Sequence, residues 1–325
     1  MAQPLLELKQ LQTYFIADQG ARIIKAVDGV SLTLEAGQTL GVVGESGSGK
    51  TITSLSILRL LPTAARIVGG EIWFAGENLL QKSERAMQRL RGSQISMILQ
   101  DPMMSLNPLF TIGEQLAEPL RVHLGLRRSS LAERVRDLLQ GVRIPTPEIR
   151  MHEYPHQMSG GMRQRIVGAI SISCEPHLII ADEPTTSLDV TIQAQYLRLL
   201  KEIQERAGLA MIFITHNIGI VAKMCDYVAV MYAGKVVERA PVRSIFNQPA
   251  HPYTEALLHA VPKLTEASER LWSIEGQPPD PANLPSGCPF HPRCPKAETR
   301  CGVESPPEMR IAEEHYTRCW LWEQS

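Results

Sequence analysis

The stretch that decides the fold is residues 44–51, which read Gly44-Glu45-Ser46-Gly47-Ser48-Gly49-Lys50-Thr51. They match G-x-x-x-x-G-K-[ST] at every fixed position, between an apolar strand-like run at 39–43 and a helix-like segment at 51–61. The glycines let the backbone wrap around phosphates, and the helix start adds a positive dipole end. Lys50 offers a charge to the β- and γ-phosphates and Thr51 a hydroxyl to Mg²⁺. The sequence therefore predicts a nucleoside triphosphate site.

A pair of carboxylates follows a second buried, strand-like run. Residues 178–181 read Leu-Ile-Ile-Ala and lead directly into Asp182 and Glu183. At this place Asp182 can hold Mg²⁺ through water, and Glu183 can polarise the water that attacks the terminal phosphate. The alternative is an exposed acidic pair at a strand end, which the phosphate loop in the same chain disfavours.

A third element lies before a helix-like run at residues 165–173, and it reads Ser159-Gly160-Gly161-Met162-Arg163-Gln164. Ser159 is a plausible helix cap, and the paired glycines free backbone N–H groups at the helix start. The chain therefore carries a second potential phosphate-binding element, and one chain rarely folds both onto one nucleotide.

The apolar pattern predicts an α/β protein with a helical insertion. Strands are expected at 5–15, 23–34, 70–74, 95–99, 178–181, 211–214 and 228–231, and a helix at 193–206. Between 107 and 158 apolar residues recur at helical spacing: Leu116, Leu120, Leu131, Val135, Leu138 and Leu139. Alternating strands and helices predict a mainly parallel sheet. The Pro-rich segment 276–285 is expected to be a linker over the surface.

Bulk composition narrows the class of partner. The 325 residues contain 33 Lys and Arg against 34 Asp and Glu, a net charge of −1. This balance disfavours a protein whose main partner is nucleic acid. No apolar stretch is long enough to cross a bilayer, and the first residues lack a signal-peptide pattern, so we expect the chain to stay in the cytoplasm.

Six cysteines are distributed unevenly. Cys174 and Cys225 lie in the body of the chain, and the other four crowd into the last 38 residues: Cys288, Cys294, Cys301 and Cys319. In a cytosolic protein such a cluster favours a metal or iron–sulfur site over disulfides. The spacing contains no C-x₂₋₄-C pair, which a structural zinc site usually has. From the residues alone, zinc, a [4Fe-4S] cluster and uncoordinated thiols remain open.

Taken in chain order, these elements resemble the nucleotide-binding subunits of ABC transporters over residues 5–262. The resemblance implies an α/β fold, a P-loop ABC-type nucleotide-binding domain with an antiparallel β subdomain, an inserted helical subdomain and a Cys-rich C-terminal extension. It implies ATP hydrolysis with Mg²⁺. The residues that it assigns to ATP are Phe15, Gly44, Glu45, Ser46, Gly47, Ser48, Gly49, Lys50, Thr51, Gln100, Ser159, Gly160, Gly161 and Asp189.

The resemblance also assigns individual roles. Glu183 and His216 are the implied catalytic residues, and Thr51, Gln100 and Asp182 are the implied Mg²⁺ ligands. Phe15, with Tyr14 as the alternative, is the aromatic residue that would stack on adenine. Two positions depart from the family pattern, Asn217 where aspartate is usual and Met162 where glutamine is common. Neither must do chemistry, so we expect an active enzyme. Other histidines, His251 among them, have no such support.

Local strings narrow the branch to dipeptide and oligopeptide importer ATPases, with nickel importers as close relatives. These strings are 100–108, 159–165, 182–191, 251–254 and 288–295. In this branch such a cysteine tail can hold a [4Fe-4S] cluster, with Cys288, Cys294, Cys301 and Cys319 as ligands. The implied domains are an ATPase domain at 1–262, with a helical subdomain at about 102–172, and an extension at 263–325 with the four-cysteine site.

The resemblance implies partners as well. The chain would pair head to tail with a second, homologous ATPase on the cytoplasmic face of a bacterial inner membrane. It would power two membrane permeases, and an external substrate-binding protein would deliver the peptide. The same role with a nickel chelate, glutathione or a sugar-like solute stays open. A soluble ABC ATPase acting on nucleic acid or ribosomes is a distant alternative, which the net charge of −1 disfavours.

Overall fold

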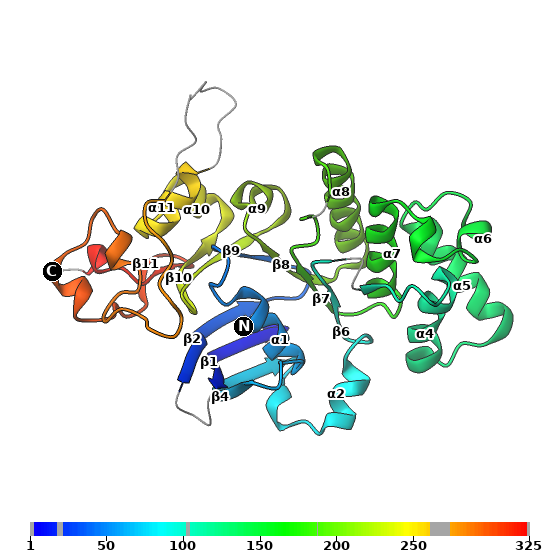
Figure 1. Ribbon diagram of the computed structural model, residues 1–325, viewed down its shortest axis with the longest axis horizontal. Helices are drawn as coiled ribbons and strands as arrows, with labels where there is room; N and C mark the ends of the chain where they lie inside the picture. The colour runs from blue at the N-terminus through cyan, green and yellow to red at the C-terminus, as the bar shows by residue number, and fades with distance from the viewer. Residues whose placement is uncertain (1–2, 18–21, 102–104, 187, 261–273, 324–325) are drawn as a thin grey trace. The chain divides into compact units, whose positions relative to one another are not determined.

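The computed structural model describes residues 3–17, 22–101, 105–186, 188–260 and 274–323. The chain forms two compact units, whose elements are labelled in Figure 1. The first unit comprises residues 1–35, 39–80 and 213–325, and the second comprises 36–38 and 81–212. The predicted boundary between 262 and 263 lies outside the described residues, as does the predicted start of the helical subdomain at 102.

The first unit contains a four-stranded antiparallel sheet in the order β2-β1-β4-β5. Its strands are β1 (Leu6–Ala17), β2 (Arg22–Leu34), β4 (Ala65–Phe74) and β5 (Glu77–Asn78). Alternation along the strands buries one face, on which Leu6, Leu8 and Ile72 are almost fully covered. The antiparallel β subdomain is therefore present as predicted, drawn in blue and cyan in Figure 1.

A strand, a loop and a helix of the first unit hold the glycine-rich segment. β3 (Thr39–Val43) is buried along its whole length and pairs in parallel with β9 (Tyr227–Tyr232). The helix α1 (Lys50–Leu58) starts one residue before the predicted position. It ends three residues earlier than predicted because Arg59 adopts a left-handed conformation, with φ 53°, which closes the helix.

The remaining body of the first unit follows β8 (Ala210–Thr215), which begins in the second unit and ends in the first. Its further elements are α9 (Ile218–Met224), β10 (Lys235–Pro241), α10 (Val242–Asn247) and α11 (Pro252–His259). β10 runs antiparallel to β9. The sheet is therefore mixed, because the parallel pattern predicted from the sequence ends at β9.

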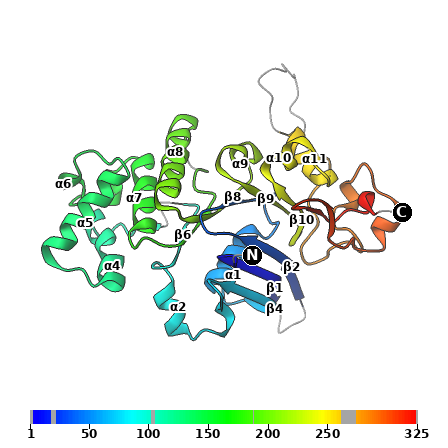
Figure 2. The same cartoon turned by 180° about the vertical axis from the view of Figure 1, so that it is seen from behind.

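The second unit is mostly helical, and it is larger than the predicted helical subdomain at about 102–172, since its main segment runs from residue 81 to residue 212. Its elements are α2 (Glu84–Leu90), β6 (Ile95–Ile98), α4 (Ile112–Leu124), α5 (Arg128–Gly141), α6 (Pro147–Arg150), α7 (Gly160–Ile172), β7 (Leu178–Asp182) and α8 (Val190–Ala207). Figure 2 shows α4 to α7 grouped together. The six apolar residues singled out in this region are all buried. β6 and β7 are parallel. Across the described ranges, no helix is long and apolar enough to span a membrane.

Residues 274–323 form the last described segment of the first unit. It contains short 3₁₀ turns, η4 (His291–Arg293), η5 (Thr299–Gly302) and η6 (Trp320–Trp322), and two strands, β11 (Met309–Ala312) and β12 (His315–Thr317). β12 pairs antiparallel with β10, and β11 pairs with β12. The order β11-β12-β10-β9-β3 therefore links this tail to the strand that precedes the glycine-rich loop.

Candidate functional site

The glycine-rich loop between β3 and α1 is shaped by close backbone approaches. A Cβ on Gly44 would lie 2.2 Å from the carbonyl oxygen of Met231, and one on Gly49 would lie 2.2 Å from that of Ala26. Both positions therefore exclude any side chain. At Gly47, with φ +81°, a Cβ would meet nothing within 4 Å, so the loop is open on that side.

The ammonium of Lys50 lies inside this loop. Lys50 is only 6% exposed, and its Nζ donates to the carbonyl oxygens of Gly44 and Glu45 at 2.8 and 2.9 Å. A third contact reaches the hydroxyl of Ser48 at 3.3 Å. The positive charge is thus fixed at the start of α1, where the helix dipole also favours an anion.

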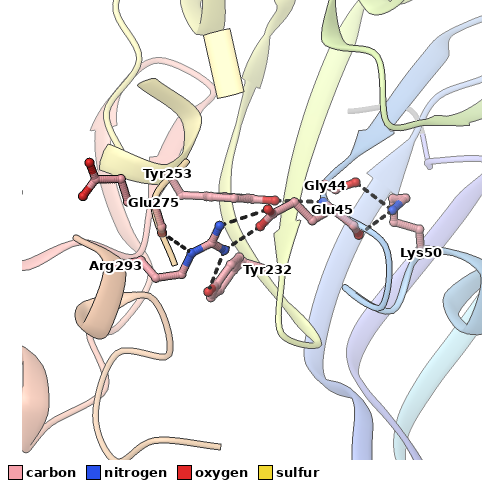
Figure 3. Close-up of polar contacts among 7 residues, drawn as sticks. All are labelled: Gly44, Glu45, Lys50, Tyr232, Tyr253, Glu275 and Arg293. Carbon is pink, nitrogen blue, oxygen red and sulfur yellow. Dashed lines mark hydrogen bonds and ion pairs between the residues drawn. The ribbon is translucent and has the colours of Figure 1, made fainter. Parts of the chain in front are cut away.

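Residues from the C-terminal half anchor the loop at Glu45 (Figure 3). The backbone N–H of Glu45 donates to the hydroxyl of Tyr253 at 2.8 Å. Its carboxylate accepts two hydrogen bonds from the guanidinium of Arg293, at 2.7 and 3.0 Å. Sequence reasoning missed both partners. Both partners lie in the strings 251–254 and 288–295, which mark the branch of the family, but no local pattern in these strings pairs them with the loop.

In the second unit, Glu183 follows directly on the buried Asp182 at the end of β7. One oxygen of its carboxylate accepts from the side-chain amide of Gln100 at 3.2 Å and from the hydroxyl of Thr186 at 2.9 Å. The backbone of Glu183 has φ 44°, a left-handed conformation that a non-glycine residue adopts only when its surroundings impose it. The structure therefore brings Gln100 and Glu183 together, as neighbours at the end of a buried strand.

The predicted cap at Ser159 is present at the start of α7. Its hydroxyl accepts from the N–H of Met162 at 3.3 Å. Ser159 and Gly160 are exposed, and a Cβ on Gly160 would meet nothing within 4 Å. Gly161 faces the helix α8, where a Cβ would lie 2.8 Å from Cγ2 of Ile192. Asp189 caps α8 by accepting from the N–H groups of Thr191 and Ile192. Ser187, two positions before Asp189, lies outside the described residues.

The first unit holds the other predicted residues. His216 is exposed and follows β8 directly. The neighbouring Asn217 caps α9 by accepting from the N–H of Gly219 at 2.9 Å, as an aspartate would, so this departure costs the fold nothing. Phe15 is partly buried in β1. The hydroxyl of Tyr14 donates to Asp28 at 2.7 Å, and burial together with this bond raises the pKa of Tyr14 to about 12.

Comparison with known proteins places these features in a family. Residues 27–186 match the ABC transporter family, and residues 237–301 match the family described as oligopeptide/dipeptide transporter, C-terminal region. A putative peptide import ATP-binding protein of Brucella ovis is 48% identical, covering 99% of this chain and 98% of the relative. The chain belongs to the ABC transporter ATPases.

Other proteins similar to this ABC transporter ATPase are also transport ATP-binding proteins. A dipeptide transport ATP-binding protein of Bacillus subtilis is 46% identical, covering 99% of this chain and 96% of its own length. Its counterpart in Escherichia coli is 44% identical over 97% of this chain and 96% of its own length. Among solved structures, a dimeric ATP-binding cassette in a post-hydrolysis state bound to ADP and Pi superposes with a TM-score of 0.65. That structure is 25% identical and covers 73% of this chain and 99% of itself.

Each unit of the ABC transporter ATPase offers hard oxygen donors of the kind that Mg²⁺ prefers. Thr51 offers a hydroxyl in the first unit, and Gln100 and Asp182 offer an amide oxygen and a carboxylate in the second. Asp182 is 3% exposed and closes the buried strand β7. The open side of the loop at Gly47 leaves room for phosphates beside the ammonium of Lys50.

The structure does not support the predicted [4Fe-4S] site in the tail. Over the described parts of the chain, which include Cys288, Cys294, Cys301 and Cys319, no three Cys, His, Asp or Glu side chains are grouped to hold a metal ion. The structure nevertheless brings the four cysteines to one place, because all four line one small cavity of about 20 Å³.

The surroundings of these cysteines explain the disagreement. Cys288 is packed into an apolar cluster with Phe290 and Tyr253, against which Cys294 and Cys301 also lie. Burial raises the pKa of Cys288 and Cys294, and raises that of Cys319 to about 11. In this structure Cys288, Cys294 and Cys301 pack as small apolar residues.

Proposed function

We propose that this ABC transporter ATPase hydrolyses ATP to drive the import of di- and oligopeptides through membrane permeases. The observation that carries the proposal is similarity along the whole chain to proteins named as peptide import ATP-binding proteins. The match of residues 237–301 to an oligopeptide/dipeptide transporter region supports the same cargo, because it covers segments outside the nucleotide motifs.

At the nucleotide, the loop 44–51 is the proposed phosphate cradle, with Lys50 as its charge. Mg²⁺, held by Thr51, Gln100 and Asp182, would offset the charge of the phosphates. Glu183 is the proposed general base: Gln100 and Thr186 orient its carboxylate, and its φ of 44° fixes the backbone that carries it. His216 is proposed to act at the terminal phosphate, and Phe15 to stack on adenine.

The element at 159–161 is proposed to contact a nucleotide held by a second subunit. Ser159 and Gly160 are exposed at the start of the 13-residue helix α7, so their backbone can approach an anion on another chain. Asp189, which caps α8, is proposed to lie at the same interface. A dimer of this kind would close on ATP and reopen after hydrolysis, which transmits work to the permeases. The solved ATP-binding cassette similar to this chain is itself described as dimeric.

The assembly would contain a second, homologous ATPase, two permeases and an external substrate-binding protein. The assembly would lie at the cytoplasmic face of the bacterial inner membrane. Within this chain, the proposed ATPase domain is 1–262 and the proposed C-terminal extension is 263–325. These features rest on the family alone.

Uptake of a labelled dipeptide by cells that lack the chain tests the proposal. Wild-type protein should restore uptake, and Lys50→Ala should not, because the loop would lose its charge. The same cells should be assayed for nickel uptake. Restoration of nickel uptake without dipeptide uptake would overturn the proposed cargo.

A further inference from the structure

The glycine-rich loop contains the carboxylate of Glu45, whose negative charge would repel the phosphates of the proposed nucleotide. Glu45 follows Gly44 directly, and its carbonyl oxygen lies 2.9 Å from the ammonium of Lys50. The side chain of Glu45 therefore belongs to the segment that would surround the phosphates. Like charges at close range repel strongly where water is partly excluded. An uncompensated carboxylate at this position would weaken the binding of a polyphosphate.

Arg293 compensates this charge. Its guanidinium forms a bidentate pair with the carboxylate of Glu45, the geometry that gives the strongest ion pairs. The side chain of Arg293 is 5% exposed and that of Glu45 is 27% exposed, so solvent screens the pair only in part. A lysine has no planar fork and could not reproduce both bonds.

Arg293 is itself held from several directions, as Figure 3 shows. Its Nε donates to the carbonyl oxygen of Glu275 at 3.0 Å, and one terminal nitrogen donates to the hydroxyl of Tyr232 at 3.3 Å. The preceding Phe290 is 1% exposed and packs edge-on against Tyr232, with ring centroids 5.2 Å apart. The short turn η4 thus presents Arg293 in one fixed position.

We propose that Arg293 is a positioning residue of the nucleotide site, which neutralises Glu45 and fixes the glycine-rich loop for phosphates. The C-terminal tail is then part of the ATP-binding apparatus. The inference rests on the proposed assignment of residues 44–51 as the phosphate cradle. The hydroxyl of Tyr253 supports the same geometry by accepting a hydrogen bond from the backbone N–H of Glu45. Arg293 and Tyr253, both from the C-terminal part of the chain, therefore bind the same residue of the loop.

Removing the charge of Glu45 in a variant that lacks Arg293 shows whether Arg293 neutralises that charge or only holds the tail against the loop. ATP dissociation constants should be measured for the full chain with Arg293→Ala, Arg293→Lys, Glu45→Gln and the double variant Glu45→Gln/Arg293→Ala. Arg293→Ala should weaken ATP binding about tenfold or more, since the partly buried carboxylate of Glu45 is left uncompensated in the loop. Arg293→Lys should fall between wild type and alanine. The double variant should recover to within about threefold of wild type, because the repelling carboxylate is gone.

Lys296→Ala is the matched control. Lys296 pairs with Glu255 of α11 at 2.7 Å and so also ties the tail to the body, but both side chains are largely exposed, at 50% and 40%. Its loss should leave ATP affinity unchanged. Thermal unfolding of each variant shows whether the fold is kept.

Two results would overturn the inference. One is wild-type ATP affinity in Arg293→Ala. The other is an affinity loss that Glu45→Gln does not recover, which would assign Arg293 to bracing alone. Lys50→Ala keeps this test distinct from the proposed function. If Lys50→Ala binds ATP like wild type, the phosphate cradle is wrongly assigned; if it loses ATP while Arg293→Ala does not, only the present inference fails.

Discussion

The side-chain amide of Gln100 donates a hydrogen bond to the carboxylate of Glu183 across 3.2 Å. The two residues are 83 positions apart, and each follows directly or almost directly on a strand of the parallel pair β6 and β7. Because parallel strands end at the same edge of a sheet, the pairing places an amide beside the proposed general base. The bond lets Gln100 orient the carboxylate of Glu183.

Substitution of Gln100 should therefore change the pH dependence of turnover. Gln100→Glu puts a second carboxylate beside Glu183, and two close carboxylates raise the pKa of one of the pair. A base must be deprotonated to act, so the acidic limb of the pH–rate profile should move to higher pH in Gln100→Glu. Gln100→Ala should lower turnover without moving that limb upward. Superimposable profiles for all three proteins would contradict the arrangement.

Gly160, at the start of α7, should be needed for ATP turnover and not for the stability of the fold. A Cβ on Gly160 meets nothing within 4 Å, so Gly160→Ala should change the unfolding free energy by less than about 0.5 kcal/mol. It should still lower ATP turnover at least roughly tenfold, if the backbone here approaches a nucleotide on a second subunit. Wild-type turnover in Gly160→Ala would remove this element from the site.

Gly161→Ala, in contrast to Gly160→Ala, should lower the stability of the fold. Its Cβ would lie 2.8 Å from Cγ2 of Ile192, and such overpacking costs about 1–3 kcal/mol of stability. The double variant Gly161→Ala/Ile192→Ala removes the clash and should regain part of the lost stability, as measured by urea unfolding. No difference between single and double variants would show that the clash is not the cause.

His251 should make stability depend on pH. Burial lowers its pKa to about 4, although the nearby carboxylate of Glu238 opposes the shift. The unfolded state, with a pKa near 6.5, binds a proton first as the pH falls, so stability is complete above about pH 6.5 and is lost toward pH 4. Between pH 7 and pH 5 the loss from this group should be roughly 2 kcal/mol.

The variant His251→Asn tests whether His251 causes this pH dependence of stability. Nδ1 of His251 accepts the N–H of Tyr253 at 3.0 Å and caps α11, and the oxygen of an asparagine can do the same without titrating. Urea unfolding at pH 7 and pH 5 should show a smaller difference for His251→Asn than for wild type. Equal differences would mean that another group carries the pH dependence.

Much of the fold is visible in the sequence because it is local. The strand at 39–43 is a continuous apolar run, and the glycine and lysine spacing after it fits one loop geometry. The helical insertion follows from apolar spacing, and its six marked residues are buried. In each case neighbouring residues carry both the signal and the structure.

The rest depends on partners that are distant in the chain. Arg293 and Glu45 are 248 positions apart, and no local pattern joins them. The strands β11 and β12 contain only four and three residues, which is too short for an alternating pattern to identify them from the sequence, and β12 is placed by its pairing with the edge of β10. The family resemblance implies a cluster at the four cysteines, and neither it nor their spacing reports the apolar packing that buries the thiol of Cys288.

We propose that Glu183 is the general base for ATP hydrolysis, and the hydrolysis rate of Glu183→Gln is the decisive measurement. The variant keeps the hydrogen-bonding shape of the side chain and removes its basicity. Turnover should fall about a hundredfold or more, with ATP affinity within roughly threefold of wild type. If the variant binds ATP and hydrolyses it at the wild-type rate, Glu183 is not the base.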